Sequence, residues 1–484
     1  MADPATGPLT LGLDLGTSAV KALLLDAAGE VLAVGTGPFP TVTREPGQAE
    51  QDPREWLAAA ATAVAALDVT LGGAVPRWQG RVAAIGLAGQ LPTLVCLRGD
   101  QPLGPAITWK DSRADAWASR AINGAERRLL YERTGMPIDG RYLGPMFHCH
   151  WSERVRDVDG VLSAKDFLAF ALTGRRVTDP STAAGYACFD LATGAFSAEL
   201  CDRWGIPLPL LPAVLPSSDA AGTLTAAGAA LLGLPRGTPV AVGAADSVAS
   251  AYAMANLVVG TVCVTMGSST IILDAIRERR LDPSIRYLLT PHVEAGWYGR
   301  EMDLLATGTG YAWLSALFGW ADGVLDAEAL RSPPGAHGVS FTPYLGGGEQ
   351  GALWNPALRA SIRGLGLAHS AKDIARAFLE GVNFEIRRCL DVLAESASIR
   401  RVIVSGHTVG RPGYLQMLAD VLAVPVEACA LPSTAALGAA LGARSLAGLA
   451  DAAPVRRAVT ATATPGASTA AYQQLYVDYL SSTA

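Results

Sequence analysis

Two stretches of this 484-residue chain share one pattern of strand, small-residue turn and strand, and this repeat constrains the fold more than any other feature. DLGTS at residues 14–18 is matched by TMGSS at residues 265–269, and the strands that leave the two turns end in similar letters, LLLDA and IILDA. A repeat of this kind predicts two α/β domains of one design that face each other across a cleft. We place the domain boundary so that the domains span residues 8–237 and 238–484.

Local signals along the chain support an α/β organisation. Residues 52–68 (DPREWLAAAATAVAALD) predict a helix, because aspartate is a common N-cap and proline suits the first helical position. Residues 82–89 then predict a buried strand that leads into Gln90. Residues 370–393 predict a long helix with a capping box at its start and one apolar stripe, which belongs in a core.

Composition and charge exclude several classes of protein. Half of the residues are hydrophobic and 17% are charged, which is typical of a globular chain and not of a disordered one. The formal net charge of −6, without a stripe of Lys and Arg, argues against nucleic acid as a partner. The first residues, MADPATGP, lack the features of a signal peptide, and polar residues break the longest apolar stretches. We therefore expect no membrane contact and a cytoplasmic location.

The seven cysteines indicate neither a disulfide framework nor a zinc site, because they are odd in number, widely spaced and form no CxxC pair. We expect them to be small buried hydrophobic residues. Three potential metal ligands do occur together, as His148, Cys149 and His150. On a helix His148 and His150 would point to different faces, and no further His or Cys lies at ligand spacing, so ordinary packing is favoured.

The first turn, made of Gly16, Thr17 and Ser18, combines the groups that phosphate binding needs. Asp14 precedes it and Lys21 follows it. Glycine lets the backbone approach phosphate oxygens, and amides and hydroxyls donate hydrogen bonds to them. A carboxylate can hold the Mg²⁺ that screens their charge.

The second turn, made of Gly267, Ser268 and Ser269, repeats the small residues and hydroxyls of the first turn. For one such motif in isolation, a plain hairpin with glycine at a positive φ is an equal alternative. The repetition favours phosphate binding, because a nucleotide cleft between duplicated domains requires two facing phosphate loops.

Asp246 is the strongest candidate for a catalytic residue. It ends a buried strand in GAADS, where a carboxylate is unfavourable unless it is used or paired. A phosphoryl-transfer enzyme needs a base within hydrogen-bond reach of the attacking hydroxyl, and an aspartate in the cleft wall can supply it. The alternative is an N-cap for a helix over residues 247–254, and both roles can hold together.

These motifs and others along the chain resemble those of the FGGY carbohydrate kinases, most closely the xylulokinase-type members. The resemblance runs from about residue 9 to about residue 446. The stretches that carry it are LGLDLGTSAVKALLLD, ITWKDSRA, KDFLAFALTG, VTDPSTAAGYACFDL, GAADS, FTPYLGGGEQ, LEGVNFEIR and LQMLADVLAVPV. Each stretch alone is a weak signal, but the set is specific.

The resemblance implies an actin-like fold of two ribonuclease-H-like domains, with the sugar bound mainly by the first and the nucleotide mainly by the second. It also implies ATP and Mg²⁺ as cofactors and a homodimer as the assembly. By the positions that match the family motifs, Asp246 is the catalytic base and Asp14 is the carboxylate near Mg²⁺. The residues expected near the nucleotide are Gly16, Thr17, Ser18, Lys21, Gly267, Ser268, Gly308 and Gly406. The residues expected near the sugar are Gln90, Trp109, Asp111 and Asp246.

The chain departs from the family pattern around both ligands. Leu91 and Pro92 follow Gln90 where family members carry a polar or basic pair, and Ser247 follows the catalytic aspartate where Asn or Gln is common. Loss of hydrogen-bond donors to substrate hydroxyls can change the preference for one substrate over another by orders of magnitude. The adenosine loop reads SGHTV at residues 405–409 in place of a Gly-Gly-Gly-Ala run, which leaves weaker ATP binding or another nucleotide open.

These observations predict a kinase that phosphorylates a hydroxyl of a small sugar or polyol with ATP, and a ketopentose such as xylulose or ribulose is favoured. One alternative is a degenerate member that acts as a sensor or slow ATPase. The altered ligand residues motivate that alternative, and the retained Asp14, Thr17, Asp246 and Gly267 oppose it. A second alternative is an actin-like filament or chaperone ATPase, which would have no use for ITWKDSRA and FTPYLGGGEQ.

Overall fold

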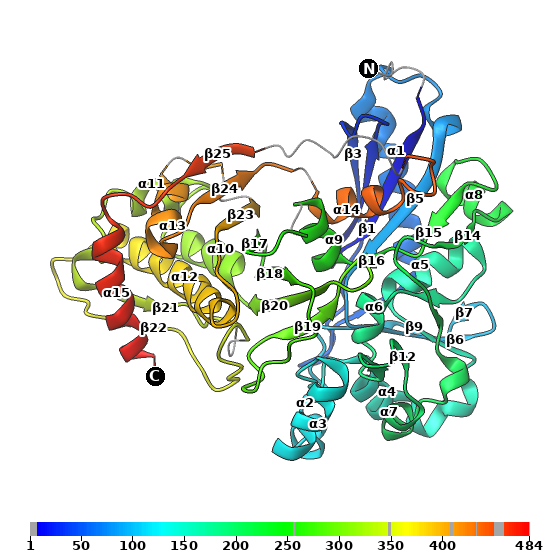
Figure 1. Cartoon of the computed structure of the whole chain (residues 1–484), viewed down its shortest axis with the longest axis horizontal. Helices are drawn as coiled ribbons and strands as arrows, with labels where there is room; N and C mark the ends of the chain where they lie inside the picture. The colour runs from blue at the N-terminus through cyan, green and yellow to red at the C-terminus, as the bar shows by residue number, and fades with distance from the viewer. Residues whose placement is uncertain are drawn as a thin grey trace.

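A computed structural model of the chain describes residues 7–254, 257–346, 350–406, 410–411, 413–431, 433–449 and 459–483. Over these ranges the chain forms two lobes, each built around a seven-stranded sheet (Figure 1). The blue-to-green first half of the chain forms most of one lobe, and the yellow-to-red part forms most of the other. This arrangement confirms the predicted α/β fold with two domains of actin-like, ribonuclease-H-like design.

The first sheet is centred on an apolar meander at the start of the chain. β1 (Leu9–Leu15), β2 (Ala19–Leu25) and β3 (Val31–Pro38) are antiparallel neighbours, and β5 (Val82–Gly89) lies parallel to β1. Every residue of β1 is buried, which suits a central strand covered on both faces. The remaining strands are β14 (Ala220–Thr223), β15 (Pro239–Ala241) and β16 (Ala244–Ala245). The order is β14-β15-β5-β1-β2-β3, with β16 pairing with β5.

The second sheet repeats the pairing of the first. β17 (Thr261–Met266) is antiparallel to β18 (Thr270–Ile276) and parallel to β23 (Arg401–Gly406), as β1 is to β2 and β5. β20 (Tyr298–Leu304) lies beside β18, as β3 lies beside β2. The other strands are β19 (Leu288–Pro291), β24 (Val426–Cys429) and β25 (Val459–Ala463), and the order is β19-β20-β18-β17-β23-β24-β25. The sequence repeat therefore marks equivalent strands of two sheets.

The two helices with the clearest sequence signals start where they are predicted. α1 (Pro53–Leu71) packs on β2 and β3, and the Asp52 carboxylate caps its N-terminus. α12 (Ala371–Ala394) starts with a capping box formed by Ser370 and Asp373. Its apolar stripe lies in the core of the second lobe, as predicted.

The remaining elements of the described residues are shorter. The other helices are α2 (Asp115–Ala121), α3 (Gly124–Thr134), α4 (Leu143–Trp151), α5 (Ala164–Thr173), α6 (Pro180–Ala184), α7 (Ala198–Trp204), α8 (Ala226–Leu232), α9 (Asp246–Ala253), α10 (Thr307–Leu317), α11 (Val324–Ala329), α13 (Tyr414–Leu422), α14 (Thr434–Gly442) and α15 (Thr469–Ser482). The short strands of the first lobe are β4 (Glu50–Gln51), β6 (Thr93–Arg98), β7 (Gln101–Pro102), β8 (Ala106–Thr108), β9 (Gly160–Leu162), β10 (Val177–Thr178), β11 (Phe189–Asp190), β12 (Ala195–Phe196) and β13 (Ala213–Val214). The second lobe adds the pair β21 (Ser340–Thr342) and β22 (Ser361–Arg363).

Helix α14 comes late in the chain but packs against the first sheet, on β1 and β5 (Figure 1). Glycines make this approach possible. A Cβ atom on Gly12 or Gly86 would lie 1.8 Å from a main-chain oxygen of α14, and one on Gly438 would lie 1.9 Å from Ala249 O of α9. α9 and α14 also share a buried apolar cluster with residues of both sheets. The two helices thus join the lobes through direct backbone packing.

The strand predicted to end at Asp246 is interrupted. β15 ends at Ala241, and the two-residue strand β16 resumes the pairing just before α9 begins. Gly243 turns the chain with a φ of 82°, at a point where a Cβ would lie 2.0 Å from Leu87 O. The alternative role for Asp246, as an N-cap, is wrong, because Ala245 holds the N-cap position and Asp246 is the first helical residue.

The domain boundary between residues 237 and 238 stays a prediction. β15 and β16 follow residue 237 in the chain, yet both pair with β5 in the first sheet. The strand pairing therefore favours a boundary later in the chain.

The His-Cys-His cluster lies on α4, and the cysteines form no disulfide in the described residues. Six of the seven cysteines are buried, as expected, but Cys149 is exposed, against expectation. His148 stacks on Trp117 with ring centroids 4.3 Å apart. Across the described ranges, no group of three or more His, Cys, Asp and Glu side chains could hold a metal ion. Within the same ranges, no helix is both long and apolar enough to cross a membrane.

Candidate active site

The first and second turns lie at one cavity between the lobes. They follow β1 and β17, the equivalent central strands of the two sheets. Thr17 of the first turn and Ser269 of the second both line a cavity of about 200 Å³. The first turn is tight, because Gly16 N–H donates to Ala19 O at 3.1 Å. The predicted pair of turns is thus brought to a single site.

Two glycines from distant segments pack directly on the second turn. Gly308 N–H, in the first turn of α10, donates to Ser268 O at 3.0 Å, and a Cβ on Gly308 would lie 2.0 Å from Gly267 O. A Cβ on Gly406, at the end of β23, would lie 2.0 Å from Met266 O. The structure therefore brings four of the residues predicted near the nucleotide into one group: Gly267, Ser268, Gly308 and Gly406.

Three carboxylates line the cavity, those of Asp246, Glu301 and Asp303, and the charge of Asp14 acts on Asp246. Asp246 is the first residue of α9, and its Oδ1 accepts from Ser247 N–H at 2.8 Å. Burial raises the pKa of Asp246 to about 7, and the charges of Asp14 and Asp303 add to the rise. Burial likewise raises the pKa of Asp303 to about 6 and that of Glu301 well above its ordinary value. Such a cluster is typical of a site at which a carboxylate accepts a proton.

Asp14 has the properties of a metal-binding residue. Burial raises its pKa to about 6, although Lys21, its cross-strand neighbour on β2, partly offsets the rise. Among the residues that the structure describes, its buried Oδ1 has no hydrogen-bond partner. A buried carboxylate oxygen without a donor fits a cation such as Mg²⁺. Since no larger cluster of protein ligands surrounds it in the described ranges, phosphate oxygens and water would complete the coordination.

The cavity contains part of the predicted sugar site and several residues that sequence reasoning missed. Trp109, Leu91 and Pro92 line it, together with Thr17 and Asp246. The missed residues that line it include Arg141, Ser181, Thr290, Glu301, Asp303, Gln350 and Trp354. The two acids of β20 could have been found, because residues two apart in a strand point to the same face. Arg141 and Trp354 come from loops, where no such periodic pattern in the sequence indicates which side chains face the cavity.

Gln90 and Asp111 are not among the described residues that line the cavity. Gln90 Nε2 donates to Gln51 Oε1 at 2.9 Å, and Gln51 Nε2 donates to Thr17 O at 2.8 Å. Gln90 therefore supports the first turn from behind. The carboxylate of Asp111 is ion-paired with Arg113 at 2.7 Å. The sugar contact expected for both residues stays a prediction.

Arg141 is the one cation among the described residues that line the cavity. Its Nε lies 3.1 Å from Asp139 Oδ1, and its charge opposes the rise in the pKa of Asp303. With its amide oxygen turned toward the guanidinium, Gln350 also accepts hydrogen bonds from Arg141. The positive charge is thus already shared among several oxygens.

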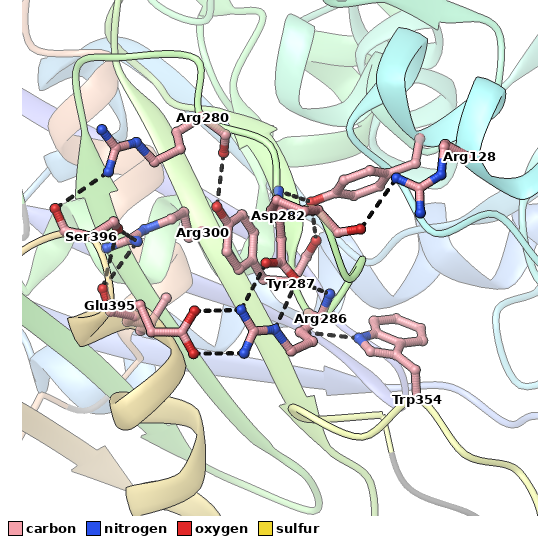
Figure 2. Close-up of polar contacts among 12 residues, drawn as sticks. Arg128, Arg280, Asp282, Arg286, Tyr287, Arg300, Trp354, Glu395 and Ser396 are labelled. Carbon is pink, nitrogen blue, oxygen red and sulfur yellow. Dashed lines mark hydrogen bonds and ion pairs between the residues drawn. The ribbon is translucent and has the colours of Figure 1, made fainter.

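Trp354 is held in the cavity wall by a polar network (Figure 2). Its indole Nε1–H donates to the main-chain carbonyl of Arg286 at 3.0 Å. The Arg286 guanidinium bridges Asp282 and Glu395, at 2.9 and 2.6 Å. The Tyr131 hydroxyl on α3 accepts from Asp282 N–H at 3.1 Å, so the network also joins the two lobes.

The fold and the site together define a class of enzyme. A duplicated α/β fold, a turn suited to phosphate on each side of one cavity and a buried carboxylate of raised pKa between them define a phosphotransferase with an alcohol group as acceptor. Family models for the N-terminal and C-terminal domains of the FGGY family of carbohydrate kinases match residues 9–253 and 255–446. The chain belongs to the FGGY family of carbohydrate kinases.

Individual relatives agree with this assignment. The chain is similar to a xylulose kinase of Lactococcus lactis subsp. lactis (strain IL1403), with 28% identity over 85% of this chain and 82% of the relative. It is 31% identical to a glycerol kinase of Gloeobacter violaceus (strain ATCC 29082 / PCC 7421), over 91% of this chain and 89% of the relative. The crystal structure of xylulose kinase from Rhodospirillum rubrum matches with a TM-score of 0.87 and 30% identity, over 98% of each chain.

Proposed function

We propose that this kinase transfers the γ-phosphoryl group of ATP to a hydroxyl of a small neutral sugar or polyol, with a ketopentose such as xylulose or ribulose as the favoured substrate. The observation that carries the proposal is the position of Asp246 in a cavity lined by residues of both turns. The xylulose kinase relatives support a ketopentose, and the glycerol kinase relative keeps small polyols in the set to be tested.

Asp246 is placed to accept the proton of the attacking hydroxyl. A pKa of about 7 makes it a base that is partly deprotonated at neutral pH. As the hydroxyl oxygen bonds to the γ-phosphorus, the bond from the γ-phosphorus to the bridging oxygen breaks, the proton passes to Asp246 and ADP leaves. The amides and hydroxyls of the two turns hold the phosphate oxygens during this transfer.

Asp14 is the residue that would hold Mg²⁺, through the oxygen that lacks a donor within the described part of the chain. When bound, the ion neutralises charge on the β- and γ-phosphate oxygens. ATP is the expected nucleotide, with Gly406 at the edge of its site. The altered loop residues His407, Thr408 and Val409 lie outside the described residues, so their effect on nucleotide preference stays a prediction.

The charge of the cavity favours a neutral substrate over a sugar acid. Asp246, Glu301 and Asp303 line it against a single guanidinium, that of Arg141. Arg141 is itself paired with Asp139. A carboxylate on the substrate would therefore meet more negative than positive charge, whereas neutral hydroxyls can donate hydrogen bonds to the acidic side chains.

The test is an ADP-release screen with MgATP over ketopentoses, ketohexoses, pentitols, erythritol, glycerol and gluconate. We expect turnover with a neutral substrate and little with gluconate. Asp246→Asn is the matched control, because it keeps the size of the side chain and removes the base. Loss of sugar-dependent turnover in a variant with an undiminished Tm supports the assignment, and retained turnover removes Asp246 from the mechanism.

The same preparation tests the other outcomes. Calorimetric binding of sugar and ATP without turnover on any member of the panel would favour the sensor alternative. Light scattering after size exclusion tests the expected homodimer, which stays a prediction.

A further inference from the structure

A buried ion cluster lies beside the chain that leads to Asp246. The Lys165 ammonium, at the start of α5, is 0% exposed and lies 2.9 Å from Asp166 Oδ1 and 3.2 Å from Asp179 Oδ1. It also donates to the main-chain carbonyl of Val242 at 2.9 Å. Lys165, Asp166 and Asp179 are absent from the described residues that line the cavity. A role in contacting the sugar is therefore not open to these three side chains.

Ser181 connects this cluster to the residue before Asp246. Its hydroxyl donates to Asp179 Oδ2, and its Oγ accepts from the main-chain N–H of Ala245 at 2.9 Å. A hydroxyl has one proton and two lone pairs, so a proton committed to the carboxylate leaves the oxygen to accept the amide. The direction of both hydrogen bonds is thereby set by the cluster.

The contacts on Val242 and Ala245 bracket a four-residue segment, residues 242–245, and Asp246 follows directly. Regular strand pairing does not hold this segment throughout, because β15 ends at residue 241 and Gly243 turns the chain with a φ of 82°. The orientation of the Ala245 peptide determines where the next side chain points. Lys165 holds one end of the segment and Ser181 holds the other.

Buried ion clusters are weak sources of stability, since an apolar cluster of similar volume is often as stable or more stable. Two hydrogen bonds from this cluster reach the segment that ends at the proposed base. We propose that Lys165, Asp179 and Ser181 are positioning residues that orient Asp246 into the cavity for phosphoryl transfer. This inference rests on the proposed role of Asp246 as the base.

Ser181→Ala is the sharpest test, because it removes only the hydroxyl that links the cluster to Ala245. We expect kcat at saturating sugar and MgATP to fall about 10- to 100-fold, the scale of a misplaced catalytic group, with an unchanged KM for ATP. Ser181→Thr keeps the hydroxyl and should recover most of the activity. Lys165→Met, in which no lining side chain changes, should lower kcat in the same way if it folds.

Tyr186→Phe is the matched control on the opposite side of the cluster. The Tyr186 hydroxyl donates to Asp166 Oδ2 at 2.7 Å and accepts from Ser163 N–H at 2.7 Å, and neither contact touches residues 242–245. Its loss should lower the Tm and leave kcat unchanged. An equal fall of kcat in Tyr186→Phe and Ser181→Ala would overturn the inference, because it would show a general structural role. A higher sugar KM at unchanged kcat in Ser181→Ala would also overturn it, because it would show direct substrate contact.

A second readout separates this inference from the proposed function. If the wild-type enzyme turns over no sugar, the proposed function fails, and amide hydrogen exchange then tests the positioning alone. Exchange at residues 242–246 should be faster in Ser181→Ala than in the wild type and unchanged in Tyr186→Phe. Equal exchange in all three proteins would overturn the inference.

Discussion

The first and second turns share a backbone plan but differ in chemistry. Each follows the central strand of its sheet and leads into an antiparallel neighbour. At the positions where the first turn has Asp14 before it and Lys21 after it, the second has Thr265 and Ile272. The second turn instead has glycine backbone packed against it, from Gly308 and Gly406. The two turns thus differ in their surroundings: charged side chains flank the first turn, and close backbone contact surrounds the second.

Asp14→Asn should have the largest effect on activity. An amide cannot replace a charged oxygen ligand, so kcat should fall on the order of 100- to 1000-fold, the loss found when one strong electrostatic contact to a transition state is removed. The matched change at the equivalent position, Thr265→Val, should leave kcat near the wild-type value. Steady-state kinetics across a Mg²⁺ titration measure both. An equal fall of kcat in the two variants would contradict the conclusion that the functional charge lies beside the first turn and not the second.

Gly308→Ala should lower stability far more than Gly16→Ala. The new Cβ would lie 2.0 Å from Gly267 O in the first case and 3.3 Å from Ala19 O in the second. Overpacking against fixed backbone lowers the free energy of unfolding by about 1–3 kcal/mol. Urea unfolding of both variants measures the difference, with the KM for ATP as a second readout. A larger loss of stability for Gly16→Ala than for Gly308→Ala would contradict the conclusion that the close backbone contact is at the second turn.

Asp246→Asn should raise the Tm at pH 8 and raise it by a smaller amount at pH 5. The pKa of Asp246 in the folded protein is about 7, above its ordinary value of 3.8. Between pH 3.8 and about 7, the folded state therefore keeps a proton that the unfolded state has lost. Stability from this group therefore falls as pH rises through that window. We expect a gain of at least about 2 °C at pH 8, which corresponds to roughly 1 kcal/mol in a domain of this size.

The activity of the wild-type enzyme should depend on the same protonation of Asp246. Because the base must be deprotonated, kcat/KM should rise with pH up to about 7 and then level off. Thr265→Val, which changes no titrating group, should keep both the pH profile and the pH dependence of the Tm. A rise of Tm at pH 5 as large as that at pH 8 in Asp246→Asn would contradict the assigned pKa.

Lys21→Met should have the smallest effect. Lys21 is exposed and is not among the described residues that line the cavity, and its charge lowers the pKa of Asp14. Its removal should reduce Mg²⁺-dependent activity at pH 6 by a factor of about 2 to 5, the range of an exposed charge pair, with little change at pH 8. A rise in the KM for ATP at both pH values would instead show the direct phosphate contact predicted from the sequence.

The strands and turns could be predicted because their signals are local. β1, β2, β17 and β18 appear where apolar runs and small-residue turns place them. Asp246 was found for the same reason, since a carboxylate at the end of a buried strand stands out. Its strand nevertheless breaks at Gly243, where φ is 82° and a Cβ would lie 2.0 Å from Leu87 O, a closeness that no local pattern reveals.

The composition of the cavity was harder to predict, because it depends on how distant segments pack. Arg141 and Trp354 reach it from loops that the two lobes hold in place. A motif match located Gln90 and Asp111 near the site but could not indicate where their side chains point. Gln90 turns toward Gln51, 39 positions away, and Asp111 toward Arg113.

The packing of α14 on β1 and β5 also has a consequence for the order in which the protein is made. The strands of the first sheet leave the ribosome long before residues 434–442 are synthesised. Until then, the face that meets Gly12 and Gly86 has no partner helix. The first lobe therefore completes its fold only when the C-terminal part of the chain arrives, and a fragment that ends before α14 leaves an apolar face open to aggregation.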